Sequence, residues 1–255
     1  MKNRIAGLLL LCAVLAATVT LTGCRRRERP ENHFIIATDT TFAPFVFENA
    51  LGQRVGIDMG LIAAIAEDQG FTFELMPVGF HAALAAVESG QADGVIAGMS
   101  ITEPRRLVFD FSQPYFDSGV VMAIRADNFE IQGYEDLRGR TVAVKTGTEG
   151  AAFAESIQSQ FGFQLVYFGE SPMMYEAVLA GHAAALFEDY PVVTFGIRQG
   201  SGLKVVTEME RGSSFGFAVR RGRNQELLRM FDEGLSNLKA SNAYQAILDR
   251  YISTE

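Results

Sequence analysis

Short apolar runs alternate along the chain with segments of helical period. The runs are rich in Val, Ile, Leu, Ala and Phe, which is typical of strands buried on both faces of a sheet. They cover residues 34–38, 71–77, 94–99, 120–125, 140–145, 164–168, 183–187, 203–207 and 214–220. We expect helices in the gaps between these runs, so the pattern predicts an α/β fold.

Two of the expected helices carry one apolar stripe each. The stripes are Ile57, Leu61, Ala64 and Ile65 in the first helix, and Leu227, Phe231, Leu235 and Leu238 near the C-terminus. Because a stripe at this spacing normally faces the interior, we interpret both as core-forming surfaces rather than binding sites.

The order of elements recurs within the chain, which predicts two similar lobes. Segment 82–100 contains a helix, a strand and a polar turn, and segment 174–191 repeats this order. Likewise, the strand and polar turn at 34–42 are matched by those at 141–149. Polar residues thus follow the carboxyl ends of strands in each lobe, where open α/β sheets bind ligands. We therefore expect a ligand cleft between the lobes.

The N-terminus has the pattern of a lipoprotein signal peptide. An apolar run over residues 5–21 follows a basic start and ends in Leu21-Thr22-Gly23-Cys24. The run is short for a membrane span of about 20 residues, and small residues before Cys24 favour cleavage over an uncleaved anchor. We expect removal of residues 1–23, lipidation of Cys24, and a tether over 24–32.

Composition supports export and argues against nucleic acid. The formal net charge is −8, and loss of Lys2 and Arg4 with the signal peptide would make the remaining domain more acidic. The second cysteine, Cys12, lies in the segment expected to be removed, so the mature domain would hold no disulfide. We expect a protein that is anchored to the cell membrane by lipid and faces the periplasm or the cell exterior.

Several motifs then occur in a fixed order and spacing. They are Ala37-Thr38-Asp39-Thr40, Phe42-Ala43-Pro44-Phe45, Gly56-Ile57-Asp58, Ala92-Asp93, Gly98-Met99-Ser100-Ile101-Thr102-Glu103-Pro104-Arg105, Asp110-Phe111-Ser112-Gln113-Pro114-Tyr115, Val144-Lys145-Thr146-Gly147-Thr148 and Ala243-Tyr244. Together they resemble the polar-amino-acid solute-binding proteins of family 3, the receptor components of ABC importers. The resemblance covers residues 34–251, nearly all of the expected mature chain.

This resemblance implies a two-lobed periplasmic-binding-protein fold of type II, with no cofactor or metal. We assign lobe one to residues 33–114 and 217–255, the inserted lobe two to 120–212, and the hinge to 115–119 and 213–216. Closure around a ligand would prepare the receptor, expected to be a monomer, for the permease subunits of an importer.

A free amino acid presents a carboxylate and an ammonium, and each must exchange its water shell for fixed partners. Arg105 matches the carboxylate-binding arginine of the family, and its planar fork can form two parallel hydrogen bonds. Asp189 matches the aspartate that receives the ligand ammonium, although its position is also that of a helix cap. Gly98 and Ser100, which follow a buried strand, are expected to direct a carbonyl and a hydroxyl into the cleft.

The remaining predicted ligand contacts surround the ligand side chain. Phe42 and Phe80 match aromatic positions that sandwich it in the family; Phe45, Phe47 and Tyr115 are assigned to packing instead. The other predicted contacts are Asp39, Lys145, Thr148 and Glu188.

Glutamine is the favoured ligand, with arginine or lysine as the alternative. In glutamine-binding members an aspartate and a lysine stand at the positions of Asp39 and Lys145, where they can read both ends of an amide. Glu188 and Glu149 depart from that pattern, and an extra carboxylate would suit a basic ligand. Lys145 opposes a cationic ligand unless Glu188 neutralises it.

The same fold also supports enzymes similar to cyclohexadienyl dehydratase and the sensing domains of some receptors. The three histidines, His33, His81 and His182, fall in the tether, an early helix and a helix end, which suggests neither a Ser-His-Asp triad nor a metal site. A sensor would need a second membrane span or a signalling domain. We therefore expect a binding protein rather than an enzyme.

Overall fold

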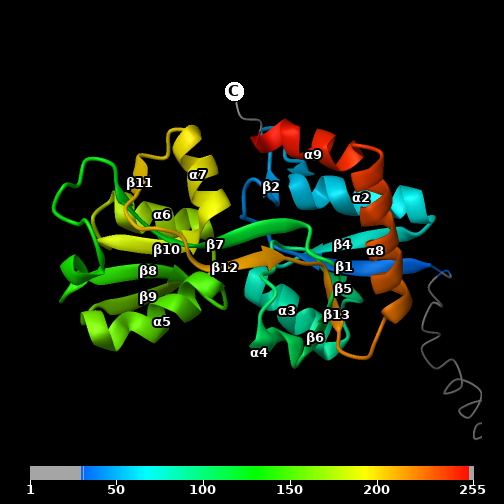
Figure 1. Cartoon of the computed structure of the whole chain (residues 1–255), viewed down its shortest axis with the longest axis horizontal. Coiled ribbons are helices and arrows are strands. Elements are labelled where there is room, and N and C mark those ends of the chain that lie inside the picture. The colour runs from blue at the N-terminus through cyan, green and yellow to red at the C-terminus, as the bar shows by residue number, and fades with distance from the viewer. Residues whose placement is uncertain (1–29, 31, 253–255) are drawn as a thin grey trace, which may run out of the picture. The chain divides into compact units, whose positions relative to one another are not determined.

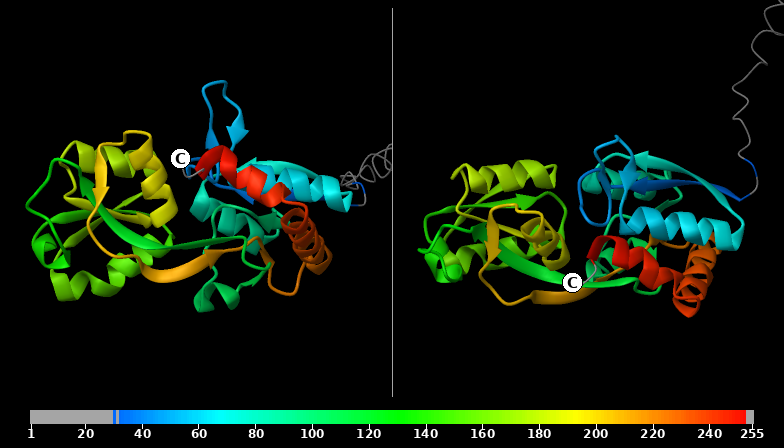
Figure 2. Two further views of the ribbon diagram at one scale, coloured as in Figure 1. Left: turned by 45° about the horizontal axis from the view of Figure 1, so that its top comes forward. Right: turned by 90° about the horizontal axis from the view of Figure 1, so that it is seen from above.

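The computed structural model describes residue 30 and residues 32–252 of the chain. From Phe34 onward these residues form two β-sheets, each flanked by helices, which make up two lobes (Figure 1, Figure 2). The predicted α/β class and two-lobed architecture are thus confirmed. The predicted signal peptide and the lipidation site at Cys24 lie outside the described residues.

Lobe one is built on a five-stranded sheet with the order β4-β1-β5-β13-β6. Its strands are β1 (His33–Thr38), β4 (Thr72–Pro77), β5 (Gly94–Val95), β6 (Phe109–Phe111) and β13 (Ala218–Arg220). β1 and β5 run parallel, so their carboxyl ends lie at the same edge of the sheet. A separate hairpin pairs β2 (Phe47–Glu48) with β3 (Arg54–Val55).

Five helices belong to this lobe. They are α2 (Ile57–Gln69), α3 (Phe80–Ser89), the short α4 (Glu103–Arg106), α8 (Gln225–Ala240) and α9 (Ala243–Ile252). α2, α8 and α9 cover one face of the sheet and α3 covers the other (Figure 1). The two predicted stripes contribute to one core, in which Leu61 and Phe231 are fully buried and Ala64 is partly buried. Burial of these apolar side chains therefore holds α2 and α8 against the first sheet.

Lobe two is built on a six-stranded sheet. It has the order β11-β7-β10-β8-β9, and β12 also pairs with β7. The strands are β7 (Phe116–Arg125), β8 (Thr141–Lys145), β9 (Gln164–Phe168), β10 (Ala185–Asp189), β11 (Leu203–Val205) and β12 (Glu210–Phe215). β8, β9 and β10 run parallel, so the last residues of β8 and β10 share one edge. A 3₁₀ turn over Tyr134–Leu137 precedes β8.

Three helices cover the second sheet. α5 (Glu149–Phe161) packs on one face, and α6 (Ser171–Leu179) and α7 (Tyr190–Arg198) pack on the other. Along the described part of the chain, no helix is both long and apolar enough to span a membrane.

Two neighbouring strands carry the chain between the sheets. The chain leaves the first sheet after β6, enters the second along β7, and returns along β12 to β13. β7 and β12 pair with Phe116 opposite Phe215. Tyr115 is fully buried beside them, and its backbone carbonyl accepts a hydrogen bond from the Tyr244 hydroxyl. The packing role predicted for Tyr115 agrees with this position.

Several strand boundaries differ from the predicted ones. The run 94–99 predicts one strand, but the ladder ends at Val95, and Gly98 then adopts the left-handed region with φ 56°. The run 214–220 is divided between β12 and β13, because the chain changes sheets around Gly216. The short strands β2, β3 and β6 have too few residues to give a recognisable alternation.

Candidate functional site

A small polar cavity lies between the facing edges of the two sheets. Its volume is about 10 Å³, roughly the room that one water molecule needs. The lining residues are Asp39, Phe42, Phe80, Gly98, Ser100, Arg105, Lys145, Thr148, Glu149 and Asp189. Nine of the ten predicted contacts are in this set; Glu188 is not, and Glu149 is present in addition.

Arg105 is presented to the cavity by the short helix α4. The Thr102 hydroxyl caps this helix by accepting from the Arg105 backbone N–H at 3.4 Å, which explains the Thr-Xaa-Xaa-Arg pattern. Arg105 Nη1 donates to the Ser100 carbonyl at 2.8 Å, and Nη2 donates to the Gly147 carbonyl in lobe two at 3.0 Å. A guanidinium has five N–H donors, so three remain for a carboxylate.

Asp189 lies at the end of β10 and is almost fully buried. It occupies the N-cap position of α7, but its side chain makes no capping hydrogen bond. Instead, its Oδ1 accepts from the Ser118 hydroxyl at 2.9 Å. Burial, followed by the neighbouring Glu188 carboxylate, raises the pKa of Asp189 to about 8. A cationic ligand group placed beside Asp189 would favour its charged form.

Asp39 and Lys145 meet across the cleft. Lys145 Nζ lies 2.5 Å from Asp39 Oδ2, and both side chains are 1% exposed. The same ammonium donates longer bonds to the Ser171 hydroxyl at 3.3 Å and to the Thr41 carbonyl at 3.5 Å. The idea that Glu188 neutralises Lys145 is therefore wrong: Asp39 is the ionic partner, and Ser171 stands between Lys145 and Glu188.

Glu188 lies behind the cavity rather than on it. Its Oε2 accepts from the Ser171 hydroxyl at 3.1 Å, and its Oε1 accepts from the Asp189 backbone N–H at 3.0 Å. Burial raises the pKa of Glu188, and the positive charge of Lys145 opposes that rise. Glu188 can therefore act on a ligand only through Ser171, Lys145 or Asp189.

Each predicted aromatic contact faces a cation of the protein. The Arg105 guanidinium lies 5.3 Å from the centre of the Phe80 ring, and Lys145 Nζ lies 5.5 Å from the centre of the Phe42 ring. Phe42 also packs against Gly98, where an added Cβ would come within 2.2 Å of the ring. The aromatic rings thus help to fix the two cations.

The smaller polar residues organise the cavity mainly through bonds to the protein. The Thr148 hydroxyl donates to the Lys145 carbonyl at 2.8 Å and accepts from the Ala151 backbone N–H, which caps α5. The Gly98 N–H donates to the buried Asp58 carboxylate at 2.8 Å. Burial raises the pKa of Asp58 to about 7. Asp58, in the Gly56-Ile57-Asp58 motif, therefore holds the cavity-lining turn in place.

Glu149 is a cavity residue that was not predicted to bind ligand. It is the first residue of α5, and its carboxylate lies 3.9 Å from Arg105 and 3.8 Å from Arg211. The only sequence signal is its position, directly after the Lys145–Thr148 segment. A glutamate there is equally well explained by a favourable charge at a helix N-terminus.

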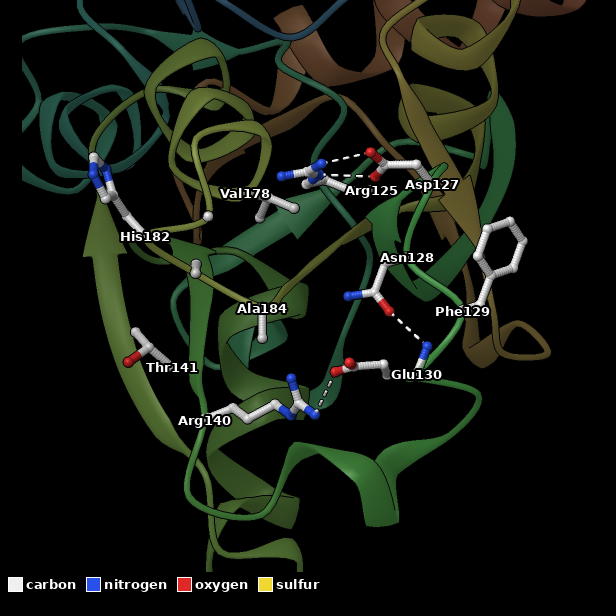
Figure 3. A pocket seen from close by; sticks show the side chains of 12 residues that line it. Arg125, Asp127, Asn128, Phe129, Glu130, Arg140, Thr141, Val178, His182 and Ala184 are labelled. Carbon is white, nitrogen blue, oxygen red and sulfur yellow. Dashed lines mark hydrogen bonds and ion pairs between the residues drawn. The ribbon is translucent and has the colours of Figure 1, made fainter.

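A larger hollow of about 640 Å³ lies at the opposite edge of the lobe-two sheet (Figure 3). Its charged residues are paired with each other: Arg125 donates two hydrogen bonds to Asp127, and Arg140 donates to Glu130 at 3.3 Å. This edge also holds the amino ends of β8 and β10, which is not where such sheets normally bind ligands. We therefore place the functional site in the smaller cavity.

The chain is similar to known solute-binding proteins. Residues 34–254 match the model of the bacterial extracellular solute-binding proteins, family 3. The arginine-binding extracellular protein ArtP of Bacillus subtilis is 25% identical over the whole of both chains. The second substrate-binding domain of a putative amino acid ABC transporter from Streptococcus pneumoniae is 44% identical, with a TM-score of 0.60 over 86% of this chain and 100% of that chain.

An ancestral arginine-binding protein is also similar, and it has been solved with two ligands. Its arginine-bound structure is 32% identical, with a TM-score of 0.82 over 88% of this chain and 100% of that chain. Its glutamine-bound structure has the same identity and TM-score. Because the family model covers nearly all of the described residues, the chain belongs to the bacterial extracellular solute-binding proteins of family 3.

Proposed function

We propose that this chain binds a polar L-amino acid, preferring glutamine, and delivers it to the permease of an ABC importer. The observation that carries this proposal is the presence of Arg105 and Asp189 on one small cavity, each contributed by a different lobe. Arg105 retains donors for an α-carboxylate, and Asp189 offers a carboxylate for an α-ammonium. A ligand that engages both would hold the lobes together.

Asp39 and Lys145 support an amide side chain. Asp39 can accept from an amide NH₂, and Lys145 can donate to the amide oxygen in place of its long bond to Thr41. An arginine guanidinium could pair with Asp39 only by displacing Lys145, whose Nζ lies 2.5 Å from Asp39 Oδ2. This cost favours glutamine over arginine.

Arginine or lysine is the second candidate, and a specific observation favours it. Three carboxylates, from Asp39, Glu149 and Asp189, face the cavity against the two cations of Arg105 and Lys145. Once a ligand ammonium holds Asp189 in its charged form, this excess of negative charge would suit a basic side chain. Among the similar proteins, the ancestral arginine-binding protein has been solved with arginine and with glutamine, so one related site accommodates both.

An enzymatic role has less support. One similar structure is an ancestral amino acid-binding protein described as a precursor of cyclohexadienyl dehydratase, 28% identical with a TM-score of 0.79. In the described part of this chain, no group of histidine, cysteine, aspartate and glutamate residues could hold a metal ion. Incubation with prephenate or arogenate separates the two roles, because turnover would identify an enzyme.

The experiment that tests the proposed function is a thermal-shift panel with the twenty common amino acids. A ligand that binds only the folded state raises the melting temperature. We expect the largest rise with glutamine and a smaller one with arginine, whereas no rise with any amino acid would contradict the proposal. We further propose that the receptor is a monomer anchored to the membrane through lipid on Cys24.

A further inference from the structure

Glu149 places a carboxylate of the protein beside the arginine that is proposed to receive the ligand carboxylate. Glu149 Oε1 in lobe two lies 3.9 Å from Arg105 Nη2 in lobe one. The two side chains are only 15% and 11% exposed, so solvent screens their attraction weakly. Any ligand that uses Arg105 must bring its negative charge close to that of Glu149.

Arg211 lies near the other oxygen of the same carboxylate. Its Nη1 lies 3.8 Å from Glu149 Oε2. Two contacts outside the cavity hold the Arg211 guanidinium there: Nη2 donates to the Ser156 hydroxyl at 2.9 Å, and Cζ lies 5.5 Å from the centre of the Phe153 ring. Arg211 therefore has a position that does not depend on a ligand.

Neither arginine forms a hydrogen bond with Glu149. Both separations exceed the roughly 2.7–3.2 Å of such bonds, so the carboxylate is shared between two guanidinium groups. We propose that Glu149 is a built-in competitor of the ligand carboxylate for Arg105, and that Arg211 weakens this competition by drawing Glu149 away. The inference rests on the proposed function and names the residues that tune affinity within it.

The competition concerns the α-carboxylate, which every amino acid carries. Glu149 therefore sets the affinity for the whole ligand class, whereas Asp39 and Lys145 set the preference among side chains. Arg211 does not contact the ligand in this account; it is a positioning residue that acts only through Glu149.

Calorimetric titration of four proteins tests the inference: the wild type, Glu149→Gln, Arg211→Gln and the double variant. Glu149→Gln keeps the shape and removes the charge, so it should strengthen glutamine and arginine binding by the same factor, about three- to tenfold. Arg211→Gln should weaken both ligands by a similar factor. In the double variant, loss of Arg211 should add nothing to the effect of Glu149→Gln.

Glu155→Gln is the matched control. Glu155 also lies on α5, but it accepts a hydrogen bond from the Tyr167 hydroxyl and does not line the cavity. It should leave both affinities unchanged, and melting curves establish that each variant is folded.

Three results would overturn the inference alone: an unchanged affinity in Glu149→Gln, a weaker one, or an Arg211→Gln effect that persists in the double variant. A weaker affinity would mean that Glu149 contacts the ligand ammonium. Absence of amino acid binding by the wild type would overturn the proposed function itself, so the two failures are distinguishable.

Discussion

Asp39 of lobe one and Lys145 of lobe two form a buried ion pair across the cleft, with 2.5 Å between Oδ2 and Nζ. Both residues also line the cavity. The Asp39 carboxylate and the Lys145 ammonium, which are proposed to bind the ligand side chain, therefore also join the two lobes. Because breaking a buried pair leaves a charge without a partner, the proposed function makes ligand choice and lobe closure depend on one contact.

Lys145→Met separates the two ligand hypotheses. For glutamine, loss of the ammonium donor should weaken binding by about 1–3 kcal/mol. For arginine the sign reverses, because Asp39 then becomes free to pair with the guanidinium. Titration of both ligands measures this difference, and arginine that outbinds glutamine in the wild type and gains further in the variant would identify a basic-amino-acid receptor.

The variant needs a stability control, since Asp39 loses its partner. Removing one member of a buried pair costs about 3–5 kcal/mol of folding free energy. The double variant Asp39→Asn/Lys145→Met should recover part of that stability without recovering glutamine affinity. Lys204→Met, which removes a lysine that lies outside the cavity and contacts Phe129, should leave affinity unchanged.

The raised pKa of Asp189 predicts that the stability of the ligand-free protein depends on pH. Burial raises its pKa from 3.8 to about 8, so between these values the folded state binds more protons than the unfolded state. The free energy of unfolding should therefore fall as pH rises from about 4 to about 8. Asp58, with a pKa raised to about 7, acts in the same direction.

Asp189→Asn should make that fall shallower, which denaturant titrations at several pH values would measure. The same pKa predicts that a ligand ammonium displaces a proton from Asp189 at pH 7. Calorimetry in buffers of different ionisation enthalpy should then detect net proton release, up to one proton per ligand. Equal proton release by Asp189→Asn would contradict this assignment.

Gly98 predicts a steric effect on the site. It has φ 56°, and an added Cβ would lie 2.2 Å from the Phe42 ring. Gly98→Ala should therefore displace Phe42 and abolish most ligand affinity. Gly70→Ala is the control, because Gly70 has φ 70° and no atom within 4 Å of the added Cβ. Both variants should lose about 1 kcal/mol of stability from the left-handed conformation, but only Gly98→Ala should lose binding.

Cys24 predicts lipid anchoring. The Leu21-Thr22-Gly23-Cys24 pattern makes Cys24 the acceptor, so Cys24→Ser should abolish incorporation of radioactive palmitate. Membrane association alone is a weaker readout, because an uncleaved signal peptide also retains a chain at the membrane. Equal labelling of mutant and wild type would show that lipid is attached elsewhere or not at all.

Local sequence determines much of the fold and several site positions. Arg105 was predicted from its match to the carboxylate-binding arginine of the family, and the Thr102 cap that positions it lies only three residues away. Asp189 was predicted from the same resemblance, because its place after an apolar strand suits a helix cap nearly as well. The local sequence does not show whether the Asp189 side chain caps a helix. Its Oδ1 instead accepts a hydrogen bond from the Ser118 hydroxyl, and Ser118 lies 71 positions away in the sequence.

The partner of Lys145 could not be predicted in the same way. Asp39 directly follows β1 and Glu188 lies at the end of β10, so either carboxylate satisfies the local pattern. The choice is made by packing: Ser171 at the start of α6 lies between Lys145 and Glu188. Asp39, 106 positions from Lys145 in sequence, lies 2.5 Å from it. Glu149 was missed as a ligand-site residue for a related reason, since its two arginine neighbours come from distant segments.

In the proposed function, Arg105 holds the carboxylate of the amino acid ligand. Calorimetric titration of Arg105→Ala measures this role. Arg106→Ala is the control, because the neighbouring Arg106 pairs with Glu103 and does not line the cavity. Losing a buried, hydrogen-bonded charge partner weakens the binding free energy by about 2–5 kcal/mol, which is roughly a thirty-fold to several-thousand-fold loss of affinity. Arg105→Lys should recover only part of that loss, since the planar fork is gone.

We expect Arg105→Ala to remain folded and to lose binding of every amino acid that the wild type binds, while Arg106→Ala keeps the wild-type affinity. A folded Arg105→Ala protein that binds its amino acid as tightly as the wild type would show that Arg105 does not hold the ligand carboxylate.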